Sequence, residues 1–146
     1  MMTEAIETKP PTWYWVVAIL ALLWEAMGVA SYLYHVSLTP ADIDALPGGQ
    51  AALMRMTPAW VNGAFAVATW GGLLGALGLL LRRRWARALL IVSLVAIVVQ
   101  FGWVFAVAQA HLLIGPSSII FPAVIFLIGI LLVWFAGIAT RRGWLR

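Results

Sequence analysis

Long apolar runs alternate with short polar stretches along the whole chain. Crossing the hydrocarbon core of a bilayer takes roughly 20 apolar residues in a helix. Four runs reach that length, over residues 13–35, 58–81, 87–110 and 117–139. Only the first contains a charged residue well inside it, Glu25. The pattern predicts an all-α membrane protein with four transmembrane helices.

The segments between the runs complete the predicted organisation. On the cytoplasmic side we expect a tail over residues 1–12, a basic loop over 82–86 and a basic tail over 140–146. On the periplasmic side we expect a loop with short interfacial helices over 36–57 and a turn over 111–116. In the long loop, Thr39, Pro40 and Asp42 form the N-cap, first-turn proline and acid of a helix start. QAALMRM predicts a second short helix, and Pro58 can open the next span. A connector on the membrane surface is favoured over a lid above an outward-facing cavity.

Positive charges set the expected orientation. Lys and Arg in short loops are retained on the cytoplasmic side of the membrane. Basic residues cluster after the second and fourth runs, at Arg82, Arg83, Arg84, Arg87, Arg141, Arg142 and Arg146. With both clusters inside, only Arg55 of the nine Lys and Arg residues lies outside. This predicts an antiparallel helical bundle with both termini in the cytoplasm.

The composition narrows the class of protein. The chain is 64% hydrophobic and only 10% charged, which excludes an ordinary water-soluble domain. It has no cysteine, which excludes disulfides and thiolate-bound metals. Tryptophan and tyrosine favour the membrane interface, and the inner boundary is predicted at Trp13, Tyr14, Trp15, Trp85, Trp134 and Trp144. Trp24 and Trp70 fall near mid-membrane instead.

Small residues recur on one side of the second run. Ala64, Ala68, Gly71, Gly75 and Gly78 follow a spacing of three or four, which places them on one helical stripe. Gly71 and Gly75 form a GxxxG pattern, which lets another helix approach closely. Gly71, Gly75 and Gly78 are therefore predicted helix-packing residues. Their partner is a helix of the same chain or a second copy in a homodimer.

Glu25 is the most informative single residue. It lies about 18 Å along a helix that starts at Trp13, near the bilayer centre. A carboxyl group there costs at least ~2.5 kcal/mol, so it should face the bundle interior and be protonated or paired. No Lys or Arg lies at matching depth. Two explanations for Glu25 therefore remain: a neutral, hydrogen-bonded acid, or a carboxyl group in a water-filled pocket.

Other polar residues share the outer half of the predicted bundle. Gly28, Tyr32 and His35 lie on the same helical face as Glu25. Asn62, Thr69 and Gln100 occupy the same half of other spans, and Gln100 and His111 are predicted to share a face. Candidate solute or proton sites are Glu25, Tyr32, Asn62 and Gln100. The alternative is structural: Glu25, Asn62, Thr69 and Gln100 hydrogen-bond one another across helices, each bond contributing about 0.6 kcal/mol.

The sequence lacks the residues that an enzyme, a metal site or a cofactor site would need. The sequence has no nucleophilic triad, phosphate-binding glycine loop or zinc motif, so we expect no catalytic residue, metal site or cofactor, and no enzyme. His35 and His111 are better explained as hydrated interfacial residues than as haem or metal ligands. Topology and anionic lipid account for the basic loop, so a nucleic-acid partner is not implied.

Motifs along nearly the whole chain carry a family resemblance. They are WYWVVAILALLWEAMGV, PAW, GGLLGALGLLLRRRWA, SLVAIVVQF, IIFPAVIF and GWLR. With them the chain resembles a family of small bacterial inner-membrane proteins commonly labelled "sugar transporter". The resemblance implies the four-span architecture and the bacterial inner membrane as location. It assigns no binding residue.

Two functional hypotheses follow. The first is a small transport protein for a small polar solute, working as a homo-oligomer, with its site between the first three spans. The second is a non-catalytic accessory or structural subunit that packs into a larger membrane complex through the glycine stripe or the fourth span. Trp24, Trp70 and Trp103 are expected to leave little central volume in one chain, so a sugar-sized path would need a dimer.

Overall fold

Four long helices dominate the computed structural model, which describes residues 8–146. They are α1 (Thr12–Ser37), α4 (Ala59–Leu80), α5 (Trp85–Gly102) and α7 (Ile120–Arg141). A π-helical turn, Trp103–Val107, extends α5, and a 3₁₀ turn, Pro116–Ile119, precedes α7. With these extensions all four are long and apolar enough to cross a membrane. The prediction of an all-helical membrane protein with four spans is confirmed over the described residues. Part of the predicted tail 1–12 lies outside them.

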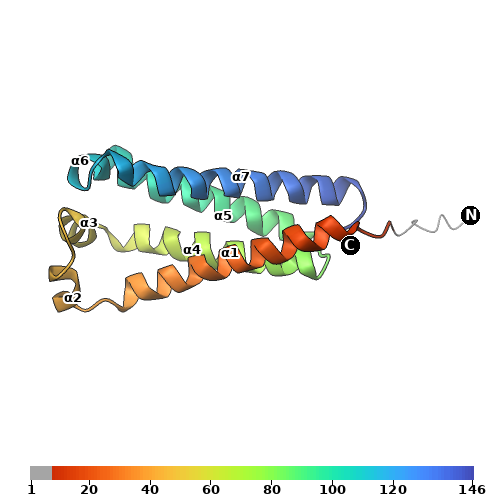
Figure 1. The fold of residues 1–146 in the computed structure, drawn as a ribbon, viewed down its shortest axis with the longest axis horizontal. Coiled ribbons are helices and arrows are strands. Elements are labelled where there is room, and N and C mark those ends of the chain that lie inside the picture. Colours follow the sequence, from red (N-terminus) through yellow and green to blue (C-terminus); the bar gives the residue numbers. More distant parts are fainter. Residues whose placement is uncertain (1–7) are drawn as a thin grey trace, which may run out of the picture.

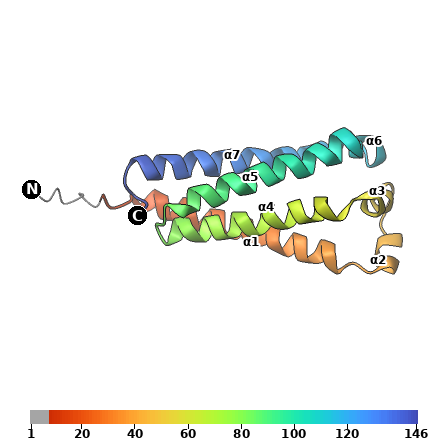
Figure 2. The ribbon, with the colours of Figure 1, turned by 180° about the vertical axis from the view of Figure 1, so that it is seen from behind.

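The two ends of the bundle differ in what they carry. The start of α1, the α4–α5 turn and the C-terminal residues gather at one end, which we call the basic end (Figure 1). Three short helices lie at the opposite, loop end (Figure 2): α2 (Pro40–Asp44), α3 (Gln50–Met56) and α6 (Ala110–Leu113). Helix α4 packs between α1 and α5, and α7 packs against α5. The loop end and the basic end therefore offer different environments to the same four helices.

Two helix boundaries differ from the sequence prediction. The third span ends at Val107, before Gln109, whose φ of +51° places it in the left-handed region that breaks a helix. His111 consequently belongs to α6, and the predicted shared face of Gln100 and His111 is wrong. Pro58 is the N-cap of α4 rather than its first helical residue, so the helix begins one residue later.

The glycine stripe of α4 packs against α5 within the same chain. A Cβ added at Gly75 would lie 2.7 Å from Cγ of Leu90, and one at Gly78 would lie 2.8 Å from Cβ of Ala86. At Gly71 the nearest atom, Cβ of Ser93, would be at 3.6 Å. At Gly75 and Gly78, only glycine permits this close approach of the two helices. The helix that packs on the glycine stripe is therefore α5 of the same chain. This surface is then not available for a homodimer contact.

Aromatic side chains close the basic end. Tyr14 is completely buried, stacks on Phe135 of α7 at 5.4 Å between ring centroids, and donates its hydroxyl to the carbonyl of Leu79 in α4. Trp144 is also buried, edge-on to Tyr14 at 5.7 Å. Tyr14 and Trp144 are thus packed inside the bundle, where their rings fill the space between α1, α4 and α7.

The C-terminal residues are tied to the α4–α5 turn by backbone hydrogen bonds. The amide of Arg84 donates to the carbonyl of Arg146 at 2.9 Å, and the amide of Arg146 donates to the carbonyl of Arg82 at 2.6 Å. Nε of Arg82 donates to the carbonyl of Trp144 at 2.7 Å. Gly143, with φ of +71°, allows the chain to reverse after α7. These bonds hold Trp144 and Leu145 in the closed end.

Candidate functional site

The loop-end half of the bundle contains a cavity of about 670 Å³. Its walls come from the loop-end halves of all four long helices, and α3 lies over it. The prediction of little central volume is wrong for this half. Trp70 is 42% exposed and points away from the bundle, and Trp103 does not border the cavity, so only Trp24 of the three tryptophans does.

Glu25 lies at the floor of this cavity, toward the middle of the bundle. Its carboxyl group is placed directly over Gly72 of α4, because a Cβ added at Gly72 would lie 2.6 Å from Cδ of Glu25. One turn farther along α1, Gly28 approaches Thr69 of α4, at 3.6 Å from an added Cβ to Cγ2. The two glycines bring α1 and α4 together, and Gly72 leaves the space that the carboxyl fills.

Glu25 has no hydrogen-bond or ion-pair partner among the residues that the structure describes. Thr69 donates instead to the carbonyl of Phe65 at 3.0 Å. Asn62 pairs with His35, with 3.1 Å between Oδ1 and Nε2. The structural alternative, a network joining Glu25, Asn62, Thr69 and Gln100, is therefore not formed within residues 8–146. The carboxyl faces the cavity.

The sequence candidates are only partly brought together. Glu25, Asn62 and Gln100 border the cavity, whereas Tyr32 lies outside it, with its ring edge-on to Phe65 at 5.4 Å. Tyr32 shares a helical face with Glu25, but its ring packs between α1 and α4 and does not reach the cavity.

Ser93 of α5 was not anticipated and also borders the cavity. It is buried and donates to the carbonyl of Ala68 at 2.6 Å, which joins α5 to α4. A single serine in an apolar helix is a weak sequence signal, since such a residue often bonds within its own helix.

The long loop borders the cavity at the loop end. Gln50, Leu53 and Met54 of α3 border it, together with Thr57 at the end of this helix. Gly49 packs so closely on α6 that an added Cβ would lie 2.7 Å from the carbonyl carbon of Leu113. Helix α3 is thus held between α6 and the cavity. Helix α3 therefore forms part of the loop-end wall of the cavity.

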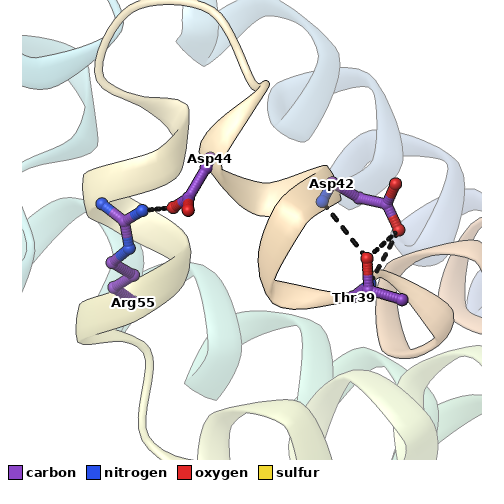
Figure 3. A network of polar contacts seen from close by, with 4 residues as sticks. All are labelled: Thr39, Asp42, Asp44 and Arg55. Atoms are coloured by element: carbon purple, nitrogen blue, oxygen red, sulfur yellow. Dashed lines mark hydrogen bonds and ion pairs between the residues drawn. The ribbon is translucent and has the colours of Figure 1, made fainter.

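Polar contacts fix the start of α2 and join α2 to α3 (Figure 3). The amide of Asp42 donates to the hydroxyl of Thr39 at 3.3 Å, and the amide of Thr39 donates to the carboxylate of Asp42 at 2.8 Å, which forms a capping box. The hydroxyl of Thr39 also donates to this carboxylate at 2.6 Å. Asp44 and Arg55 form an ion pair between exposed side chains. Exposed pairs of this kind contribute little to stability, so we assign the order of α2 mainly to its cap.

The cap makes α2 sensitive to acid. The two hydrogen bonds from Thr39, the side-chain one first, hold the pKa of Asp42 below its ordinary value of 3.8. A carboxylate with a lowered pKa stabilises the folded form above its ordinary pKa, and this contribution is lost as the pH falls through the lowered value. We expect hydrogen exchange at the α2 amides to accelerate below about pH 4. Asp42→Asn should show fast exchange already at pH 6, whereas Asp44→Asn should not. Equal exchange in the two variants would contradict the assignment.

The two histidines have separate environments. His35 bonds to Asn62, and His111 lies against Phe105 with 6.3 Å between ring centroids. Within residues 8–146, no group of three or more histidine, aspartate or glutamate side chains is placed to hold a metal ion.

The chemistry available in the cavity is that of recognition. It offers one carboxyl group, an imidazole–amide pair, the amides of Gln50 and Gln100, several hydroxyls and a largely apolar wall. No protein-family model, no curated protein and no solved structure matches this chain. Its function must therefore be inferred from the cavity itself, and the resemblance to the family labelled "sugar transporter" stays a prediction.

Proposed function

We propose that the protein is a small transport protein of the bacterial inner membrane, with its solute site in the cavity at the loop end. The observation that carries the proposal is a cavity of about 670 Å³, formed within one chain, that ends at a carboxyl group with no partner among residues 8–146. Sites for small molecules commonly have volumes of about 300–1,000 Å³. An acid inside a membrane span is costly and is usually retained for function. A single chain can therefore provide the site, without a dimer.

The arginines support an orientation for the proposed transporter. They concentrate at the basic end, which the positive-inside rule assigns to the cytoplasm. Both termini are then cytoplasmic, the bundle is antiparallel, and the loop end faces the periplasm. Because buried aromatic rings close the basic end, the cavity is accessible from the periplasmic side in this conformation.

The accessory-subunit hypothesis has less support. Its first contact surface, the glycine stripe, is covered by α5. The remaining surface is the outward face of α7, where Ile120, Phe121, Leu127, Leu131 and Trp134 are exposed. An apolar helix face of this kind is what contact with the lipid bilayer requires. It therefore does not call for a protein partner.

The absence of cysteine allows a direct test of access to the cavity. Gln100→Cys places a thiol on its wall, and Val95→Cys places one on the 57% exposed, outward face of the same helix. A membrane-impermeant maleimide added to the periplasmic side should label the first variant at least about tenfold faster, because thiolate formation requires water. Equal rates would contradict an open site. Faster labelling from the cytoplasmic side would reverse the proposed orientation.

Transport by the isolated chain separates the two hypotheses. In liposomes loaded with a pH-sensitive dye, addition of a transported solute should move protons in the presence of the purified protein. Glu25→Gln should abolish this signal if the carboxyl couples the two movements, whereas Asp44→Asn, the same charge change outside the cavity, should preserve it. An accessory subunit gives no signal in either form.

A further inference from the structure

The polar groups at the cavity floor are arranged as hydrogen-bond acceptors. A hydroxyl has one hydrogen to donate. Thr69 uses its hydrogen on the carbonyl of Phe65, and Ser93 uses its hydrogen on the carbonyl of Ala68. The oxygens of both side chains can then only accept. The carboxyl of Glu25, which has no partner among the described residues, adds two further oxygens. A ligand group that reaches this floor must supply donors.

The charges that border the cavity favour a cation. Its ionisable residues are Glu25, Tyr34 and His35, and neither lysine nor arginine is among the residues that line it. Tyr34 is 65% exposed at the mouth, and the ring of His35 is engaged with Asn62. Glu25 is therefore the one acid at the floor and faces no cationic side chain of residues 8–146. A positively charged donor would satisfy both its charge and its lone pairs.

The wall between the floor and α3 is mostly apolar, with Asn62 and Gln100 among its few polar side chains. Phe65, Ile97, Phe101, Val104 and Ile125 line it, from α4, α5 and its π-helical extension, and α7. A sugar placed against these side chains would lose hydrogen bonds to water at most of its hydroxyls, and each unreplaced bond is unfavourable. A hydrocarbon or aromatic body gains from the same contact. The wall therefore selects against a polyol.

The side of the cavity between α1 and α7 gives such a ligand a route. Met27 of α1 and Phe121 of α7 both border the cavity and are 58% and 65% exposed. Both helices carry outward faces suited to lipid. Between them, the rings of Trp24 and Phe121 approach to 6.3 Å between centroids. An apolar molecule dissolved in the bilayer can therefore contact side chains that border the cavity.

From these observations we infer that the cavity binds a lipophilic amine, with its protonated nitrogen at Glu25, Thr69 and Ser93 and its apolar body against the α5 and α7 wall. This inference rests on the proposed function only in requiring that the cavity is open to ligands. It replaces the small polar solute of the sequence hypothesis by an amphiphilic cation. The amine N–H groups donate to the oxygens at the floor, and no proton donor is needed from the protein.

Isothermal titration calorimetry on the full chain in lipid nanodiscs tests the inference, with empty nanodiscs subtracted. The probes are 4-phenylbutylamine, the alcohol 4-phenylbutan-1-ol with the same apolar body, and glucose. We expect the amine to bind roughly 10- to 100-fold more tightly than the alcohol, the range for a hydrogen bond to a charged group, and glucose to give no heat. Glu25→Gln should remove this preference. Asp44→Asn should keep it.

A second variant separates charge from shape. Glu25→Asp keeps the carboxyl and shortens the side chain, so it should bind the amine more tightly than Glu25→Gln does. Equal affinity of amine and alcohol, or equal loss in the two Glu25 variants, would overturn the inference. Binding of glucose alone would also overturn it but leave the proposed site in place. The proposed function itself fails if the Gln100→Cys thiol is as unreactive as that of Val95→Cys, or if the purified protein moves no protons in liposomes.

Discussion

Replacement of Gly75 by leucine should lower the free energy of unfolding by about 3 kcal/mol, the upper part of the usual range for overpacked cores. A Cβ at this position would lie 2.7 and 2.8 Å from two carbons of the Leu90 side chain and 3.3 Å from its backbone nitrogen. Leu90 is only 3% exposed and belongs to the buried cluster of the basic end. Its side chain has little room to move, so α4 and α5 must separate.

Gly63 offers a matched control on the same helix. It is exposed, and nothing lies within 4 Å of an added Cβ. Gly63→Leu should therefore leave stability within about 1 kcal/mol of the parent, the size of the difference in helix propensity. Reversible unfolding in mixed detergent micelles, with dodecyl sulfate as denaturant, measures both variants. Similar midpoints would show that the α4–α5 contact tolerates a side chain, and a second copy would again be a possible partner of the stripe.

Replacement of Trp144 by alanine should cost about 3–5 kcal/mol, the range for truncating a buried aromatic residue. Trp144 is 4% exposed and lies edge-on to both Trp13 and Tyr14 at 5.4 and 5.7 Å. The guanidinium of Arg142 also lies over its ring at 5.4 Å. The truncation would leave a void where α1, α7 and the C-terminal residues meet.

Trp134 is the control for that substitution. It is 61% exposed on α7, near the same end of the bundle. Trp134→Ala removes the same atoms from the lipid-facing surface and should change the unfolding midpoint much less. Thermal unfolding followed by size-exclusion chromatography in detergent compares the two variants. A loss as large for Trp134→Ala as for Trp144→Ala would contradict the buried role of Trp144.

These two tryptophans show where sequence reasoning succeeded and where it stopped. The long helices depend on hydropathy, which is a local property, and the start of α2 at Pro40 depends on three neighbouring residues. Trp134 and Trp144 both follow apolar stretches near basic residues, so the sequence assigned both to the interface. Only the hydrogen bonds between residues 82–84 and 144–146, two between backbone groups and one from the Arg82 side chain, distinguish them. Those bonds join segments more than 60 residues apart in the chain.

The candidate site was predictable to a similar extent. Helical spacing and depth were sufficient to single out Glu25, because a charge within an apolar run is visible in the sequence. They were not sufficient for Gly72, whose role depends on the rotation of α4 relative to α1. They also failed for the volume of the cavity, because the sequence does not show that Trp70 points outward. Tyr32 was assigned by its helical face alone, and the ring of Phe65 on another helix decides its place.

The closed basic end also constrains how the protein is made. Tyr14 is near the start of the first span, yet its ring is enclosed by Phe135 and Trp144. Helices of a membrane protein insert individually before they pack together. After the first helix has inserted, the ring of Tyr14 therefore lacks these two partners until residues 135–145 have been synthesised. Closure of the basic end is therefore a late event in biosynthesis, whereas α1 can pack against α4 before residue 135 is made.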